Sequence, residues 1–117
     1  MRLYFTPGAC SLSPHIALIE AGLPFELVKV DLGAKTTETG ANYLSICPKG
    51  YIPALELDDG QMLTEGAIIV QYLADRVPER KLAPLPGSFE RYRLQEQLHF
   101  LATELHKAMS PLYNPKA

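Results

Sequence analysis

The stretch IPALELDDGQMLTE, residues 52–65, predicts the turn around which the rest of the fold is arranged. Two runs rich in apolar residues, 52–57 and 61–65, flank the tripeptide Asp-Asp-Gly at 58–60. An Asp-Gly pair between two such runs is a strong local signal for a tight hairpin. The stretch is therefore predicted to form two antiparallel strands.

A helix is predicted directly after this hairpin. Thr64 is a residue type that caps helix starts, and Pro78 ends the apolar pattern that follows it. The apolar positions between them have helical spacing: Ile68, Ile69, Tyr72 and Leu73.

The N-terminal part of the chain predicts a strand, a helix and a second strand. Residues 2–5 form a short β-type run, and residues 24–32 form a second one rich in β-branched and aromatic side chains. Between these runs, Ser13 and Pro14 are predicted as the cap and the first residue of a helix over about 11–21.

The order of these elements predicts the fold. Residues 33–40 are predicted as a polar loop and 41–46 as a weak short helix. The crossover helix makes the first two strands parallel, whereas the tight hairpin makes the last two antiparallel. We therefore predict an α/β domain over residues 1–80, a βαβ-ββα arrangement with a mixed four-stranded sheet, which resembles the thioredoxin fold.

A linker and a second unit are predicted after this domain. The sequence PERKLAPLPGS at 78–88 holds three prolines and one glycine, so we place a linker at 81–87 and a helical unit at 88–117. One continuous apolar seam is predicted along this unit at Leu94, Leu98, Leu101, Leu105, Ala108 and Leu112. Such a seam must be buried, so we expect its packing partner to lie outside this chain.

Composition and charge argue against several classes of partner. The formal net charge is −2 and both signs are mixed along the chain, which disfavours nucleic acid and anionic membrane surfaces. The sequence holds no apolar run of membrane-spanning length and no signal-peptide pattern, so we expect a cytoplasmic protein. Its two cysteines, Cys10 and Cys47, are then expected to be free thiols.

Four stretches carry a more specific pattern: YFTPGACSLSPHIAL at 4–18, PKGYIPALELDDG at 48–60, LTEGAIIVQYLAD at 63–75 and RYRLQEQLHFLATELHKAMSPLYNP at 91–115. Together they resemble the bacterial beta-class glutathione S-transferases. The resemblance implies a glutathione-binding domain at the N-terminus, followed by the first helix of an all-helical domain that is incomplete in this chain. It also implies glutathione as co-substrate, a homodimer and no metal.

Cys10 lies at the predicted start of the first helix, where unpaired N–H groups and the helix dipole favour a thiolate. The alternative from its position alone is a small buried side chain. The resemblance implies that Cys10 lies beside the sulfur of glutathione and can form a mixed disulfide with it. Ser13 stands where a second redox cysteine would be, so a dithiol cycle within this motif is not available.

The pairs Ile52-Pro53 and Glu65-Gly66 flank the predicted hairpin. Pro53 is either an edge-strand proline or part of a cis peptide bond, and we predict the cis form. The resemblance implies that the Ile52 main chain pairs with the cysteinyl part of glutathione. Glu65 either stabilises the helix dipole or, as the resemblance implies, binds the γ-glutamyl group together with Gly66.

Lys35 lies in the predicted polar loop and is by default a solvated side chain. The resemblance implies instead that Lys35 pairs with the glycyl carboxylate of glutathione. It also implies that Ala9 and Tyr51 belong to the same glutathione site.

On the long helix, His99, Thr103 and His106 share one face because they are four and three residues apart. The two histidines are about 10 Å apart along the axis, too far for one zinc ion, and we predict no metal site. The resemblance implies that His106 is catalytic and donates a hydrogen bond or a proton near the glutathione sulfur. It also implies that Thr103, Glu104 and His99 contact glutathione bound in the partner subunit.

Three functions are compatible with these residues. The first is a glutathione transferase, in which groups near Cys10 and His106 stabilise the glutathione thiolate for attack on a hydrophobic electrophilic small molecule. The second is a monothiol glutathione-dependent thiol-disulfide oxidoreductase that uses the C-x-x-S pattern at 10–13. The third is a non-catalytic interaction protein with a transferase fold. We predict the first, and the presence of Cys10, Ile52-Pro53 and Glu65-Gly66 argues against the third.

Overall fold

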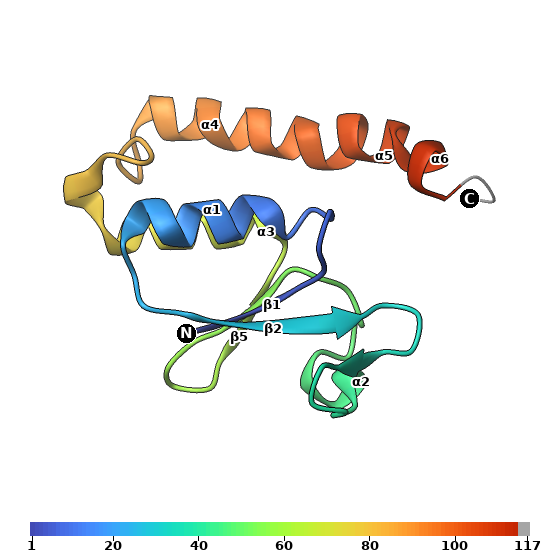
Figure 1. The fold of residues 1–117 in the computed structure, drawn as a ribbon. Coiled ribbons are helices and arrows are strands. Elements are labelled where there is room, and N and C mark those ends of the chain that lie inside the picture. Colours follow the sequence, from blue (N-terminus) through green and yellow to red (C-terminus); the bar gives the residue numbers. More distant parts are fainter. Residues whose placement is uncertain (115–117) are drawn as a thin grey trace.

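The chain forms one mixed sheet of five strands, β1 (Arg2–Phe5), β2 (Glu26–Asp31), β3 (Thr36–Thr37), β4 (Ala54–Glu56) and β5 (Met62–Thr64). The structure is a computed structural model and describes residues 1–114. The strand order is β3-β2-β1-β4-β5 (Figure 1). β1 runs parallel to β2 and antiparallel to β4, and β4 runs antiparallel to β5. The predicted parallel first pair, the hairpin and the thioredoxin-like α/β class are confirmed.

The predicted four-stranded sheet is one strand short, because residues 33–40 are not a loop throughout. β3 pairs antiparallel with the end of β2. The reversal between the two strands is stabilised locally: the Asp31 carboxylate accepts the N–H groups of Gly33 and Ala34 at 2.9 and 3.0 Å. A strand of two threonines has no apolar alternation, so the sequence pattern could not indicate it.

Helices cover both faces of the sheet. α1 (Leu12–Ala21) and α3 (Gly66–Arg76) lie side by side on one face, and the short α2 (Tyr43–Ile46) lies on the other (Figure 1). Each face buries its own apolar cluster, because side chains alternate along a strand. The cluster under α1 and α3 consists of Leu3, Leu18, Leu55, Ile69 and Leu73. The cluster on the α2 face consists of Tyr4, Val30, Tyr43, Cys47, Ile52 and Ala54.

Both main helices begin at a different residue from the one predicted. The cap position of α1 is Ser11, so Ser13 lies inside the first turn. The Ser11 hydroxyl accepts the N–H of Thr6 and donates to the carbonyl of Thr6, which fixes the loop before the helix. The cap position of α3 is Glu65, because Thr64 belongs to β5. The sheet therefore ends directly at the start of α3.

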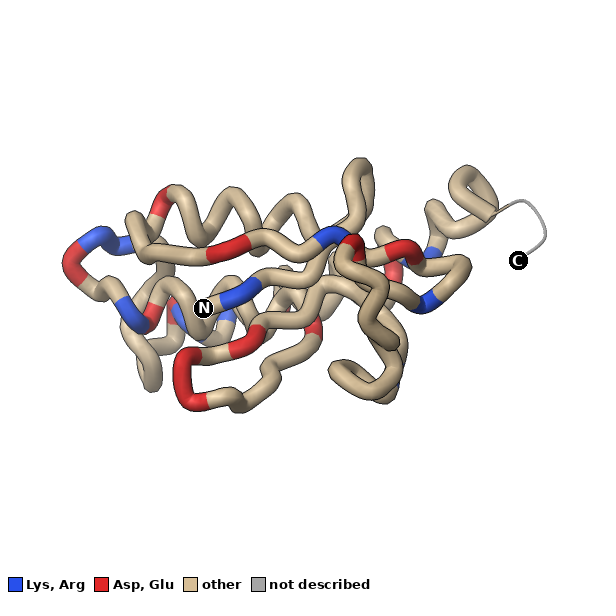
Figure 2. The backbone as a smooth tube through the Cα atoms, turned by 60° about the horizontal axis from the view of Figure 1, so that its bottom comes forward, with Lys and Arg blue, Asp and Glu red and all other residues tan. Residues whose placement is uncertain are grey.

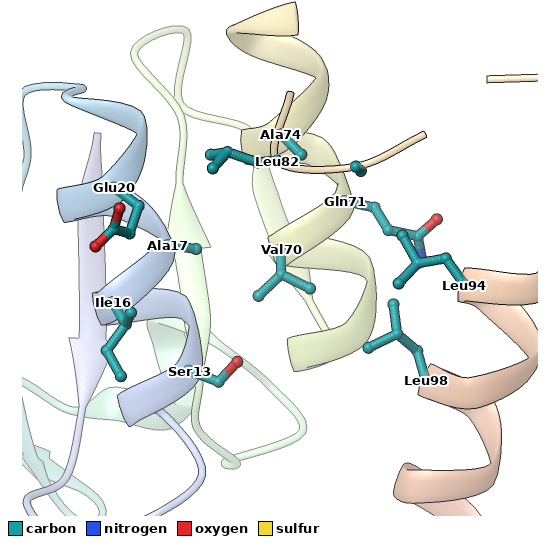
Figure 3. Close-up of a pocket in the computed structure, with 11 residues that line it drawn as sticks. Ser13, Ile16, Ala17, Glu20, Val70, Gln71, Ala74, Leu82, Leu94 and Leu98 are labelled. Carbon is teal, nitrogen blue, oxygen red and sulfur yellow. The ribbon is translucent and has the colours of Figure 1, made fainter. Parts of the chain in front are cut away.

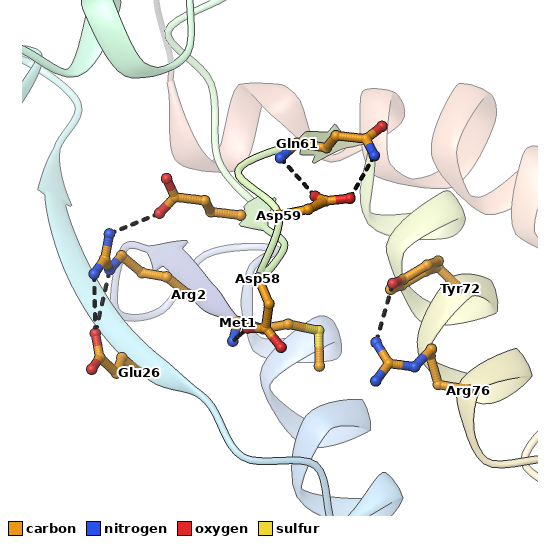
Figure 4. Close-up of polar contacts among 9 residues, drawn as sticks. Met1, Arg2, Glu26, Asp58, Asp59, Gln61, Tyr72 and Arg76 are labelled. Atoms are coloured by element: carbon orange, nitrogen blue, oxygen red, sulfur yellow. Dashed lines mark hydrogen bonds and ion pairs between the residues drawn. The ribbon is translucent and has the colours of Figure 1, made fainter.

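Charged side chains of both signs are spread over the fold (Figure 2). The N-terminal amino group of Met1 donates to Asp58 at 2.6 Å, and Arg2 bonds Glu56 at 2.8 Å and Glu26 at 3.3 Å (Figure 4). The hydrogen bond from the ammonium group lowers the pKa of Asp58. These contacts connect β1 to β2, β4 and the hairpin turn.

A rod of helical segments follows the domain. After a 3-10 turn, η1 (Pro78–Arg80), the chain forms α4 (Phe89–Phe100), a π-helical turn η2 (Leu101–Leu105), α5 (His106–Ala108) and α6 (Ser110–Tyr113). α4 begins where it was predicted, since the Ser88 side chain accepts the N–H of Arg91 at 3.2 Å. The buried Arg91 also donates to Pro84 at 2.8 Å and pairs with Asp75 of α3, which anchors α4 on the domain.

The predicted apolar seam is not continuous along this rod. In the π turn the N–H of His106 bonds the carbonyl of Leu101, so one extra residue rotates the following positions relative to α4. Leu94 and Leu98 line a cavity of about 280 Å³ between α4, α1 and α3 (Figure 3). Leu105, the last residue of the π turn, and Leu112 in α6 are both exposed.

Candidate active site

Three segments meet beside the start of α1. Cys10 comes from the loop after β1, Ile52 and Pro53 precede β4, and Glu65 and Gly66 begin α3. The Cys10 thiol donates to the Ile52 carbonyl at 3.5 Å. A Cβ atom placed on Gly66 would lie 3.7 Å from Cγ of Pro53, so α3 begins in close contact with that ring. The structure thus brings these five predicted residues together.

The main chain at Ile52 lies just outside the sheet. The Ile52-Pro53 peptide bond is cis, as predicted. β4 begins only at Ala54, so Ile52 lies outside the ladders that β4 forms with β1 and β5. Among residues 1–114 the Ile52 N–H donates no hydrogen bond. An extended peptide can pair with such a free main-chain group as an added strand would.

Glu65 has an unfavourable backbone conformation at the start of α3. Its φ is 72° and its ψ is 114°, and its side chain makes no capping hydrogen bond. A non-glycine residue with such angles costs of order 1–3 kcal/mol and persists where the surrounding structure imposes it, often at a functional site. The Glu65 carbonyl accepts from Ile68 and Ile69, so α3 begins regularly despite the strain.

The Cys10 thiol does not have the lowered pKa that its position at a helix start predicted. Burial raises the pKa of Cys10, and the negative charge of Glu65 raises it further, while a hydrogen bond from its own backbone N–H opposes them. The pKa of Cys10 is thus shifted in the direction opposite to the one that the helix start predicted, and the thiol, which belongs to an exposed residue, donates a hydrogen bond to Ile52. Helix position alone could not indicate this, because Ile52 and Glu65 are distant in sequence.

We expect Cys10 to react slowly with iodoacetamide at neutral pH and faster as the pH passes above the ordinary thiol range, because only the thiolate reacts. Glu65→Gln should shift this rate profile to lower pH, since it removes the charge that raises the pKa. Mass spectrometry of the alkylated chain separates Cys10 from the buried Cys47. An unshifted profile in Glu65→Gln would show that the two side chains do not interact.

Lys35 is not a freely solvated side chain. Its Nζ donates to the Gly50 carbonyl at 2.8 Å and lies 5.7 Å from the centre of the Tyr51 ring. Lys35 and Tyr51 therefore lie beside the segment that leads to Ile52. Ala9 packs against the apolar cluster on the α2 face. The structure places all three residues in or next to the segments that form the site.

The predicted residues on the helical rod are not joined to this site. His99, Thr103, Glu104 and His106 are exposed, and within residues 1–114 no hydrogen bond or ion pair links them to the site around Cys10. The Thr103 hydroxyl donates to the His99 carbonyl at 3.0 Å. In Figure 1, α5 and α6 extend past the end of α1 at which the β1–α1 loop lies.

The described residues contain no metal-binding cluster and no membrane-spanning helix. In the part of the chain that the structure describes, no group of three or more His, Cys, Asp or Glu residues is placed to hold a metal ion. Over the same residues, no helix has the length and apolar character needed to cross a bilayer.

The sequence reasoning missed Tyr43 and Cys47 as neighbours of the site. The Tyr43 hydroxyl donates to the Tyr51 carbonyl at 2.6 Å, and the Cys47 thiol approaches the same oxygen at 4.0 Å. In the sequence, Tyr43 lies in the weak helix predicted at 41–46, and Cys47 stands between that helix and Pro-Lys-Gly at 48–50. This pattern predicts a short helix, but it does not indicate that either side chain contacts the Tyr51 carbonyl.

Comparison with known proteins identifies the family. Residues 8–76 match the family model for the N-terminal domain of glutathione S-transferases. The chain is 53% identical to glutathione S-transferase GstA of Escherichia coli O157:H7 over 98% of this chain and 57% of that protein. A bacterial beta-class glutathione S-transferase of Sphingomonas chungbukensis matches with a TM-score of 0.97 and 51% identity, over 100% of this chain and 58% of that one. A sphingomonad glutathione S-transferase complexed with glutathione matches with a TM-score of 0.95 and 52% identity, over 99% and 58%.

The chain thus spans just over half the length of the relatives it matches. The matched residues 8–76 include Cys10, the Ile52-Pro53 pair and the Glu65-Gly66 pair, which the structure brings together. The chain therefore belongs to the glutathione S-transferase family, through the thioredoxin-like N-terminal domain of that family.

Proposed function

We propose that this chain binds glutathione and is the glutathione-binding part of a transferase that joins the glutathione thiol to hydrophobic electrophilic small molecules. One observation carries the proposal. The free Ile52 N–H, the Cys10 thiol and the Glu65 carboxylate converge from three segments on one place. A γ-glutamyl tripeptide with a central thiol offers matching groups to each of them. The proposal is supported by the similar sphingomonad glutathione S-transferase, whose structure is a complex with glutathione.

Each part of glutathione has a proposed partner in this site. The Ile52 main chain pairs with the cysteinyl residue. The Glu65 carboxylate takes the ammonium of the γ-glutamyl group, and the N–H groups at Gly66 take its carboxylate. Lys35 takes the glycyl carboxylate, leaving the Gly50 carbonyl to do so. Ala9 and Tyr51 line the site beside these groups.

The nucleophile of the proposed reaction is the sulfur of glutathione. Because burial and Glu65 raise the pKa of Cys10, its thiol keeps its proton, and its one S–H turns from the Ile52 carbonyl to donate to the nearby thiolate. His106 is proposed as a second donor from the helical rod. Thr103, Glu104 and His99 are proposed to contact glutathione bound by a partner subunit in a homodimer, and their exposure supports this role.

The proposed organisation follows the boundaries predicted from the sequence. Residues 1–80 bind glutathione, 81–87 are a linker, and 88–117 begin an all-helical domain. The residues from 115 onward lie outside the described part of the chain. The two free cysteines agree with the reducing cytoplasm as the proposed location.

The raised pKa of Cys10 disfavours the alternative of a monothiol oxidoreductase. Such an enzyme needs a thiolate at neutral pH, and here burial and the charge of Glu65 both oppose it. Cys10→Ala tests the distinction: conjugation should fall but persist, because the second proposed donor, His106, remains, whereas an oxidoreductase would lose its activity completely.

Isothermal titration calorimetry of the 117-residue chain with reduced glutathione tests the proposal. We expect saturable binding that weakens with added salt, because Lys35 and Glu65 contribute charge pairs. The matched ligand is γ-glutamyl-alanyl-glycine, which lacks only the thiol and should bind more weakly. No detectable heat with glutathione at millimolar concentration, confirmed by equilibrium dialysis, would refute the proposed function.

A further inference from the structure

Side chains from three separate segments hold the segment before cis-Pro53 by its successive carbonyl groups. Gly50 accepts from Lys35 at 2.8 Å, Tyr51 accepts from Tyr43 at 2.6 Å and Ile52 accepts from Cys10 at 3.5 Å. The Lys35 and Cys10 bonds involve groups already proposed to meet glutathione. The Tyr43 hydroxyl is not such a group, because Tyr43 is fully buried and cannot touch glutathione.

The Tyr43 bond controls a group that does face the ligand. The Tyr51 carbonyl and the Ile52 N–H belong to the same planar peptide unit, and in a trans unit they point in opposite directions. Because the carbonyl is bonded to Tyr43 inside the cluster, the Ile52 N–H is directed away from that cluster. This N–H has no partner among residues 1–114 and is the proposed donor to glutathione.

The surroundings of Tyr43 make it a rigid and permanent donor. Its ring packs against that of Tyr4 at a centroid distance of 5.6 Å, and no part of its side chain is exposed. Burial raises the pKa of the Tyr43 hydroxyl above its ordinary value, so the group keeps its proton at neutral pH. The Cys47 thiol lies near the same carbonyl but at 4.0 Å is a weaker donor.

We infer that Tyr43 is a positioning residue for glutathione: its hydroxyl fixes the Tyr51–Ile52 peptide plane so that the Ile52 N–H is presented to the ligand. This inference rests on the proposed function and deepens it. It assigns the buried tyrosine of α2 a role in binding, although Tyr43 touches no bound molecule.

Tyr43→Phe removes the hydroxyl and keeps the ring, so the core packing is conserved. We expect glutathione to bind this variant about 3- to 10-fold more weakly than the unchanged chain, the fold-change that corresponds to one lost hydrogen bond. The matched control is Tyr4→Phe, which removes a hydroxyl from the same apolar cluster. That hydroxyl donates to Glu56 at 3.5 Å and not to the segment before Pro53. Tyr4→Phe should leave glutathione affinity unchanged.

Amide hydrogen exchange at Ile52 separates positioning from general loosening. In the unchanged chain, saturating glutathione should slow exchange of the Ile52 N–H, and in Tyr43→Phe this protection should be reduced while that of β1 and β4 amides persists. Equal affinity in Tyr43→Phe, or an equal loss in Tyr4→Phe, would overturn the inference and leave the proposed function standing. The inference would also be overturned if glutathione bound the unchanged chain without slowing exchange of the Ile52 N–H. This result does not depend on whether Tyr43→Phe folds. Failure of the unchanged chain to bind glutathione would refute both.

Discussion

Glu65→Gly is expected to stabilise the fold and to weaken glutathione binding at the same time. Glu65 is held at φ 72° and ψ 114°, where its Cβ clashes with the backbone. Glycine avoids this clash but loses more chain entropy on folding, so we expect a net gain of about 0.5–1 kcal/mol in the free energy of unfolding. Urea denaturation followed by circular dichroism measures this gain.

The same change removes the carboxylate proposed to bind the ammonium of glutathione. A hydrogen bond between charged groups contributes about 1.5–3 kcal/mol, so affinity should fall by about 10- to 150-fold. Calorimetry on the folded variant measures this loss. A gain in the free energy of unfolding together with a loss of glutathione affinity would indicate that the strain at Glu65 is maintained for binding.

Glu65→Gln is the matched control because it keeps a side chain at the strained position and removes only the charge. Its free energy of unfolding should stay within about 0.5 kcal/mol of the original, while its glutathione affinity should fall as in Glu65→Gly. If Glu65→Gly were less stable than the original chain, the backbone at this position would not be strained. If both variants bound glutathione normally, Glu65 would have no part in the site.

The features that were predicted correctly depend on residues close together in sequence. The hairpin around Asp58 is fixed within five residues: the Leu57 N–H bonds Gln61, Gly60 has φ 87°, and the Asp59 carboxylate accepts the Gln61 N–H. Turn chemistry of this kind can be read from sequence because each contact lies inside the quoted stretch. The apolar spacing of α3 is equally local.

The features that were missed depend on contacts between distant residues. The helix position of Cys10 predicted a lowered pKa, but burial raises this pKa, and the charge of Glu65, which is 55 residues away, raises it further. The strain at Glu65 contradicts its own backbone preference, so no local propensity could predict it. The contact of Tyr43 with Tyr51 joins residues only eight apart, but it depends on the chain folding back between α2 and β4, which no local pattern indicates.

Regular spacing was also misleading on the helical rod. Leucines four and three residues apart predict one face only if the helix keeps about 3.6 residues per turn. The π turn at Leu101–Leu105 breaks that condition, so the positions after it, Leu112 included, are rotated relative to Leu94 and Leu98, which line the cavity. Helical periodicity thus predicted correctly that the chain is helical after Ser88. It predicted the apolar face correctly only up to the π turn.

Ile69→Ala is expected to cause the largest loss of stability. Ile69 has no exposed surface and lies in the cluster with Leu3, Leu18, Leu55 and Leu73 between the sheet and α3. Truncation to alanine leaves a cavity that the packed neighbours fill only in part, at a cost of about 2–5 kcal/mol. Because small domains are stable by only about 5–15 kcal/mol, this loss should remove a large part of the free energy of unfolding.

Ile68→Ala is the matched control on the preceding residue of the same helix. The Ile68 side chain is 48% exposed, so its truncation leaves no comparable cavity, and alanine favours the helix slightly more than isoleucine does. We expect a change within about 0.5 kcal/mol for this variant. Urea denaturation of both variants measures the difference in the free energy of unfolding. An unchanged dependence of this free energy on urea concentration would show that the unfolded states are comparable. Equal destabilisation by the two substitutions would contradict the buried position of Ile69, and with it the packing of α3 that places Glu65 and Gly66 beside Cys10.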